Sequence, residues 1–279
     1  MRLELSAVMR KTIVAAAVLV LGASTVTGAF NLISVKDEVA IGQQAQQQVR
    51  RQVPELPDAT VNNYVDGLGR RLAAAADGPR YPYTFDVANY REANAFALPG
   101  GPVWVHRGLI SSARTESQLA GVLAHEIAHI ANRHAAEQMT RSTLMNMGLG
   151  IFGALLGDGT GSQIAEVGAG VAAQATMMRF SRDDEQEADR KALQYMKRAG
   201  YDPRGMVEFL EVLRAQQGRD PGSVQTFFAS HPAPGERVQR LQLEASQLAG
   251  GRRDSQAFRQ IRSRLNGLAP AASVRATRR

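Results

Sequence analysis

From residue 31 onward, apolar residues recur mostly at helical spacing among polar ones, which predicts a largely helical chain. Pro54 ends the first of these patterns, and Gly78 with Pro79 ends the second. Ser112 to Thr115 provide capping residues for a long third helix. The predicted helices cover residues 31–52, 58–77, 112–141, 181–198, 204–217 and 234–248.

Three short runs between the second and third helices follow a different, β-rich pattern. Residues 83–87 (YTFDV) alternate, residues 94–98 (NAFAL) end at a PGG turn, and residues 103–105 (VWV) follow that turn. These runs predict a small antiparallel sheet. The expected fold class is therefore α+β, mostly helical, with one small sheet.

Two other apolar stretches lie outside this pattern. Residues 12–21 are apolar, follow three positive charges and precede small residues, which is the order of a secretory signal. We expect residues 1–29 to be a signal peptide, with an uncleaved anchor as the alternative. Residues 143–178 contain two runs, rich in Gly, Ala and Met, that are too short for the roughly 20 residues of a membrane span. This segment is a candidate lid, membrane-surface contact or pair of core helices.

Composition limits the chemistry further. The chain has 279 residues, five histidines, no cysteine and a net charge of +7. Disulfides, a thiol nucleophile and a cysteine-bound zinc are excluded, so a metal site must use histidine and carboxylate. Residues 252–279 hold eight arginines and one aspartate, so the positive charge is concentrated at the end of the chain. We therefore expect a catalytic domain over residues 30–250. The expected tail, 251–279, is basic and disordered, and suits anionic lipid or an acidic partner rather than nucleic acid.

The strongest chemical signal is the sequence HEIAH at residues 125–129. His125 and His129 are four residues apart on a predicted helix, so both imidazoles leave one face and can hold a single Zn²⁺. Glu126 is placed to act as the general base toward a water that the metal polarises. The pattern predicts a catalytic zinc site.

A third ligand must come from elsewhere in the chain. On a continuous helix, His134 would lie on the far face, and it is better interpreted as a capping or salt-bridging residue. Asn132 and Ala135 exclude the metzincin pattern. In the acidic helix at 181–198, Glu185 is the expected zinc ligand, and Asp189, four residues later, is the expected acceptor for the other N–H of a ligand histidine.

Two later residues and one strand complete the candidate site. His231 precedes a proline in a predicted loop, and Arg237 follows six residues later. Either is a candidate to stabilise the oxyanion, and His231 is also a candidate to occupy the open metal position at rest. An extended substrate is a candidate to pair with the strand at Asn94, Ala95, Phe96 and Ala97, although the same stretch equally fits an ordinary hairpin.

Together these motifs resemble the M48 family of zinc metallopeptidases, which are gluzincins. The resemblance rests on NAFALPGG at 94–101, HEIAH with the following His134, SRDDEQEAD at 181–189, and the HP pair at 231–232. The chain is similar in particular to the soluble periplasmic branch, which is BepA- and LoiP-like. The resemblance implies a zincin-like fold, with His125, His129 and Glu185 holding one Zn²⁺ and Glu126 as base. It also implies that the histidine of the HP segment caps the metal and restrains activity.

The predicted function is a periplasmic zinc endopeptidase of protein quality control, acting on misfolded or misassembled envelope proteins. Some relatives carry a TPR domain after the peptidase, and we expect none here. The alternative, from a different functional class, is a chaperone-like or adaptor protein that keeps zinc in a blocked site.

Overall fold

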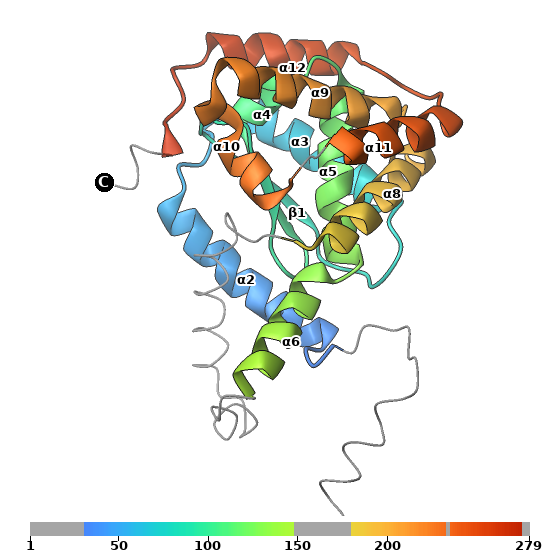
Figure 1. Ribbon diagram of the computed structural model, residues 1–279. Coiled ribbons are helices and arrows are strands. Elements are labelled where there is room, and N and C mark those ends of the chain that lie inside the picture. Colours follow the sequence, from blue (N-terminus) through green and yellow to red (C-terminus); the bar gives the residue numbers. More distant parts are fainter. Residues whose placement is uncertain (1–30, 148–179, 233–234, 275–279) are drawn as a thin grey trace, which may run out of the picture. The chain divides into compact units, whose positions relative to one another are not determined.

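Helices surround a three-stranded sheet in the computed structural model, which describes residues 31–147, 180–232 and 235–274 (Figure 1). From Leu32 onward these residues belong to one compact unit. No helix in these ranges is long and apolar enough to cross a membrane. The predicted signal at 1–29, and residues 148–178 of the apolar segment, lie outside the described residues. The helices in the first of the described ranges are α2 (Val35–Gln52), α3 (Ala59–Ala73), α4 (Arg107–Ser112), α5 (Glu116–Ala131) and α6 (His134–Met147). Those after it are α8 (Arg182–Arg198), α9 (Arg204–Arg219), α10 (Pro221–Ser230), α11 (Gly235–Gln247) and α12 (Gln256–Gly267).

The sheet consists of β1 (Thr84–Ala88), β2 (Ala95–Ala97) and β3 (Pro102–His106), in the order β1-β3-β2. β2 and β3 form the expected antiparallel hairpin, with Phe96 opposite Trp104. β1 pairs with the other edge of β3 in parallel, with Phe85 opposite Val103. The mostly helical α+β class is confirmed, but the sheet is mixed rather than antiparallel. The physical reason is that residues 89–94 carry the chain to the far side, so that β3 inserts between the two earlier strands.

Alternating side chains of the sheet supply two apolar clusters. Val103 and Val105 join the main core, which also contains residues of α3 and α5. Trp104 and Phe96 join a second cluster with Ile41 of α2. The strands are therefore covered on both faces, by α2 on one and by α3 and α5 on the other.

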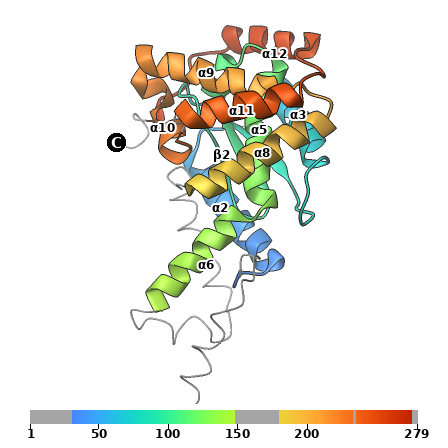
Figure 2. The same ribbon diagram turned by 45° about the vertical axis from the view of Figure 1, so that its right-hand side comes forward.

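Helix α5 lies at the centre of the helical layer, and every one of its residues is buried. It packs against α3, α8 and α9 (Figure 2). Gly121 permits the approach of α9, because a Cβ there would lie 2.7 Å from the Cα of Met206. A helix enclosed in this way holds its side chains in fixed positions, which a catalytic constellation requires.

The prediction of one continuous helix over 112–141 is wrong, because the structure divides this stretch. Arg107–Ser112 is a separate helix, and α5 ends at Ala131. Arg133 then adopts a left-handed conformation with φ of 63°, which ends a right-handed helix. Its guanidinium donates to Glu38 Oε2 at 2.9 Å, and this buried acceptor also receives the hydroxyl of Tyr81 at 2.8 Å. Contacts with α2 and with the loop before β1 therefore anchor the break.

The prediction of a disordered tail over 251–279 is also wrong for the described residues up to 274. Ser255 caps α12, and Phe258, Ile261 and Leu265 are buried in the main core. Arg264 donates to Asp58, the N-cap residue of α3, at 2.7 Å. The domain therefore extends beyond residue 250, because the arginines of this segment alternate with apolar residues on an amphipathic helix.

Removing the buried ring of α12 is expected to destabilise the whole domain. Phe258→Ala should lower the free energy of unfolding by about 3–5 kcal/mol, because Phe258 is fully buried. Urea denaturation followed by circular dichroism measures this change. Gln260→Ala, at an exposed position of the same helix, is the matched control. Equal stability of the two variants would contradict the assignment of α12 to the core.

His106, at the end of β3, is a buried structural histidine that donates from Nδ1 to the carbonyl of Glu92 at 3.1 Å. Burial lowers its pKa to about 4. The unfolded chain binds this proton near pH 6.5, so the stabilisation is complete above pH 6.5 and decreases as the pH falls toward 4. When the pH is lowered from 7 to 4, the free energy of unfolding should fall by about 3 kcal/mol less in the His106→Asn variant than in the unsubstituted protein. Denaturant titration at each pH measures this difference. Identical pH dependence in both proteins would refute this.

Candidate metal centre

Two histidines of α5 form the base of the site. His125 and His129 are one helical turn apart, and their Nε2 atoms lie 3.1 Å from each other. Both side chains are almost fully buried. Their position follows from the local pattern, because Leu119, Val122 and Ile127 direct other faces of α5 into the core. The structure thus brings together the two imidazoles that the HExxH spacing predicts.

Glu185 approaches the pair from α8. Its Oε1 lies 3.4 Å from His129 Nε2, and its Oε2 lies 3.5 Å from His125 Nε2. A capping box of Ser181 and Asp184 begins α8 one turn earlier, which fixes where the helix starts. The predicted third ligand is therefore close to both histidines, although its role stays a prediction.

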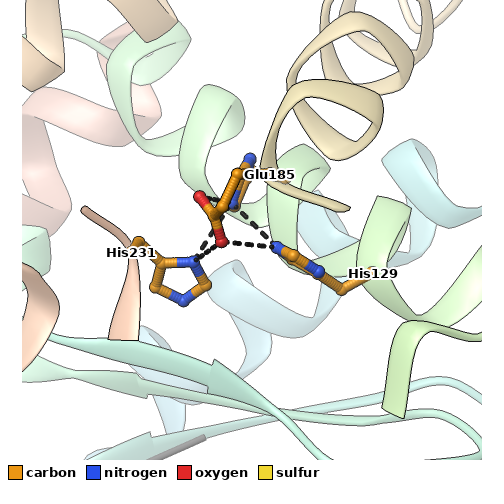
Figure 3. Close-up of side chains that lie close together, drawn as sticks. His129, Glu185 and His231 are labelled. Atoms are coloured by element: carbon orange, nitrogen blue, oxygen red, sulfur yellow. Dashed lines mark hydrogen bonds and ion pairs between the residues drawn. The ribbon is translucent and has the colours of Figure 1, made fainter. Parts of the chain in front are cut away.

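His231 completes the cluster at the C-terminal end of α10. Its Nδ1 lies 2.9 Å from Glu185 Oε1 and 3.3 Å from His125 Nε2. Figure 3 shows the Glu185 carboxylate in contact with both His129 and His231. The other ring nitrogen of His231 lies 3.4 Å from Oε1 of Glu126.

These side chains suit a metal ion by their chemistry and their burial. Histidines 125, 129 and 231 and Glu185 each offer one ligand atom, and these atoms all lie within 4.8 Å of one another. Three imidazole nitrogens and a carboxylate are the donors that Zn²⁺ prefers. The carboxylate of Glu126 is fully buried, and neither of its oxygens receives a hydrogen bond from the described residues. A buried carboxylate of this kind is typical of a site that binds a further polar group.

Asp189 and Arg237 lie behind the ligand cluster. Asp189 Oδ1 lies 3.1 Å from His125 Nδ1, where the sequence predicts the partner of a ligand histidine. Arg237 of α11 donates to both oxygens of Asp189 at 2.7 Å and forms an ion pair with Oε2 of Glu185 at 2.6 Å. It also donates to the carbonyl of Pro232. The guanidinium of Arg237 is thus bound to these two carboxylates, and its expected role toward the oxyanion stays a prediction.

The charges of the site compensate one another. Burial disfavours a protonated His125, but the carboxylates of Asp189 and Glu185 outweigh this and raise its pKa to about 9. Burial lowers the pKa of His129 well below its usual value, and positive neighbours contribute. Burial alone would raise the pKa of Glu185, yet His231, His125 and His129 hold it well below the usual range. A metal held at His125 would therefore have to displace a proton at neutral pH.

The sequence reasoning missed two contacts of His129. The ring of Phe180, just before α8, stacks on His129 with centroids 3.9 Å apart. His134 Nδ1 lies 2.8 Å from His129 Nδ1, although a continuous helix would place His134 on the far face. Its predicted salt-bridging role has a counterpart in Glu187, 3.4 Å from its Nε2. The sequence signal for this contact is the position of His134, five residues after His129.

The predicted substrate strand is an edge of the sheet. β2 pairs with β3 alone among the described strands, and it contacts α5. Asn94, just before it, is 1% exposed, and neither its side-chain oxygen nor its nitrogen has a hydrogen-bond partner among the described residues. Such an amide is suited to pair with an incoming polar backbone.

Comparisons with known proteins agree with this geometry. Residues 59–245 match Peptidase family M48. The chain is 34% identical over 227 residues to the "Beta-barrel assembly-enhancing protease" of Yersinia pestis, covering 80% of this chain and 46% of the relative. It is 29% identical over 220 residues to the "Mitochondrial metalloendopeptidase OMA1" of Schizosaccharomyces pombe (76% of this chain, 62% of the relative). To the "Metalloprotease LoiP" of Escherichia coli it is 26% identical over 164 residues (57% and 62%).

The chain spans about half the length of the beta-barrel assembly-enhancing proteases that it matches. The family match includes all the residues of the buried cluster and covers more than half of the chain. The chain belongs to peptidase family M48.

Proposed function

We propose that the chain is a zinc-dependent endopeptidase that cleaves misfolded or misassembled proteins of the cell envelope. The observation that carries the proposal is the buried cluster of His125, His129 and Glu185 beside the carboxylate of Glu126. Membership of a metallopeptidase family supports the activity. The protease names of the relatives do not favour the alternative of an adaptor with a blocked site.

In this proposal, His125, His129 and Glu185 hold one Zn²⁺. The ion, when bound, polarises the scissile carbonyl and acidifies the attacking water. Glu126 accepts the proton of that water and passes it to the leaving amine. Asp189 and Arg237 keep His125 and Glu185 oriented.

His231 fits the role of a resting-state cap. Its Nδ1 lies among the ligand atoms, and its Nε2 faces Glu126, so the ring stands between the base and the metal ligands. In this position it competes with substrate for the open metal position. Displacement of the His231 ring then precedes catalysis, after which its N–H is available to the oxyanion.

Substrate binding is proposed at the free edge of β2, with Asn94 to Ala97 pairing with an extended peptide. Asn94→Ala should lower kcat/KM toward an unfolded protein about 10-fold through the loss of its hydrogen bonds to the substrate backbone. Protein stability should stay equal or rise, because the amide lacks a partner in the described fold. Kinetics with fluorescent casein and thermal unfolding measure both effects. Asn63→Ala, an exposed position of α3, is the control. Unchanged kinetics would remove Asn94 from the site.

The proposed substrate class rests on the name of a relative, "Beta-barrel assembly-enhancing protease", and on the predicted secretory signal. We propose a periplasmic location and unfolded or misassembled β-barrel proteins as substrates. The test compares cleavage of one outer-membrane β-barrel protein in unfolded form and folded in detergent micelles. Cleavage of the unfolded form alone is expected. Equal cleavage of both forms, or of neither, would contradict the proposed substrate class.

A membrane-surface contact through residues 143–178 stays a prediction, because residues 148–178 lie outside the described ranges. A membrane-surface contact through the basic tail is less well supported, because two of its arginines form ion pairs within the fold. Arg253 pairs with Glu208 at 2.5 Å, and Arg264 pairs with Asp58 at 2.7 Å. These charges are matched within the fold.

A further inference from the structure

The two histidines of the HExxH motif have different partners at their second ring nitrogen. His125 Nδ1 lies near a carboxylate, Asp189, which is the common arrangement for a metal ligand. His129 Nδ1 lies 2.8 Å from another imidazole nitrogen, Nδ1 of His134. Both rings of this second pair are 2% exposed, so water does not compete for the contact.

One assignment of protons satisfies this contact. His129 Nε2 faces the ligand cluster and must carry a lone pair to bind a metal, so its Nδ1 carries the hydrogen. That N–H then donates to Nδ1 of His134, which acts as the acceptor. The hydrogen of His134 is consequently on Nε2, which lies 3.4 Å from Oε2 of Glu187. The series of contacts thus runs from Glu187 through His134 and His129 to the metal position.

The backbone places His134 for this contact. The left-handed Arg133 turns the chain back after α5, so that α6 begins with His134 against the side of His129. Arg133 is held by Glu38 Oε2 at 2.9 Å and by the carbonyl of Ile33 at 2.5 Å. Phe180 stacks against the face of His129, so this ring is restrained at its face and at its Nδ1 edge.

We propose that His134 is a positioning residue, whose Nδ1 accepts the Nδ1–H of His129 and keeps His129 Nε2 directed at the metal. A carboxylate, that of Asp189, lies at the corresponding position of His125, and the imidazole of His134 takes this place for His129. The inference rests on the proposed metal site, and it adds a residue that contacts neither metal nor substrate.

The test compares a variant that removes the acceptor with one that keeps it. Asn carries an oxygen at the δ position, where it can replace Nδ1, whereas Leu has similar size and no acceptor. Zinc affinity is measured by competition with a chelating dye, adding Zn²⁺ alone to the metal-free full chain. We expect His134→Leu to bind zinc about 10–100-fold more weakly and His134→Asn to stay within about 3-fold of the unsubstituted protein. The Co²⁺ absorption spectrum should change for Leu and not for Asn.

If His134 acted only through packing, the Asn variant would lose at least as much zinc affinity as the Leu variant, because Leu fills a buried position at least as well as Asn. Equal zinc affinity of both variants, or a greater loss in Asn than in Leu, would overturn the inference. Thermal unfolding of the metal-free proteins separates folding from binding, and His134→Ala replaces the Leu variant if the latter fails to fold. Absence of zinc binding by the unsubstituted protein would overturn the metal site itself and is visible before any variant is compared.

Discussion

Replacing Glu126 with glutamine is expected to lower kcat for cleavage of an unfolded protein by about 10³-fold or more, with zinc binding unchanged. Glutamine keeps the shape of the side chain but cannot accept the proton of the attacking water. Glu126 is fully buried, and its oxygens receive no hydrogen bond from the described residues. The substitution should therefore leave the fold intact. Cleavage of fluorescent casein and zinc content by atomic absorption measure the two quantities.

Two outcomes of that experiment are informative. Full casein cleavage by Glu126→Gln would refute Glu126 as the general base. Loss of zinc together with activity would mean that Glu126 supports the metal site rather than proton transfer. Glu137→Gln is a control for the same chemical change, at a partly exposed position of α6 outside the ligand cluster.

Glu185→Ala is expected to remove both metal binding and activity. The substitution deletes the carboxylate in contact with His125, His129 and His231, and it leaves Arg237 without one of its two acidic partners. With three imidazoles and no carboxylate, zinc affinity should fall by at least about 100-fold, which leaves activity at background under metal-buffered conditions. Dye competition gives the affinity, and casein cleavage gives the activity.

The matched control is Asp183→Ala, which removes an exposed acid from the first turn of the same helix. It should keep full zinc affinity and activity. If Glu185→Ala also keeps both, then Glu185 is not a ligand, and the three histidines alone would have to account for the site.

The chemistry of the site was largely predictable from the sequence, because its spacing rules are local. HEIAH lies within one helix, and Glu185 and Asp189 lie within another, so helical periodicity places each pair on one face. Their mutual contact depends on how α5 and α8 pack, which no local rule contains. The contact of His134 with His129 was not predictable, because it depends on a break at Arg133 that α2 stabilises through Glu38.

Long-range pairing also explains the two errors about the fold. The mixed sheet arises because residues between β1 and β2 cross to the other side of β3, which alternation along each strand cannot reveal. The tail appeared disordered because its arginines dominate the composition. Arg264 and Arg253 pair with acids far away in the sequence, Asp58 and Glu208, and the apolar side of α12 is buried on the core.

The central claim is that one metal ion at the buried histidine and glutamate cluster gives this chain its peptidase activity. Titration of the metal-depleted protein with Zn²⁺, with casein cleavage measured at each addition, tests the claim most directly. The account predicts no cleavage without metal, a linear rise to one equivalent of Zn²⁺ per chain, and a plateau at about that ratio, where one site is filled. Cleavage that persists in the metal-free protein, or no cleavage at one equivalent, would contradict it.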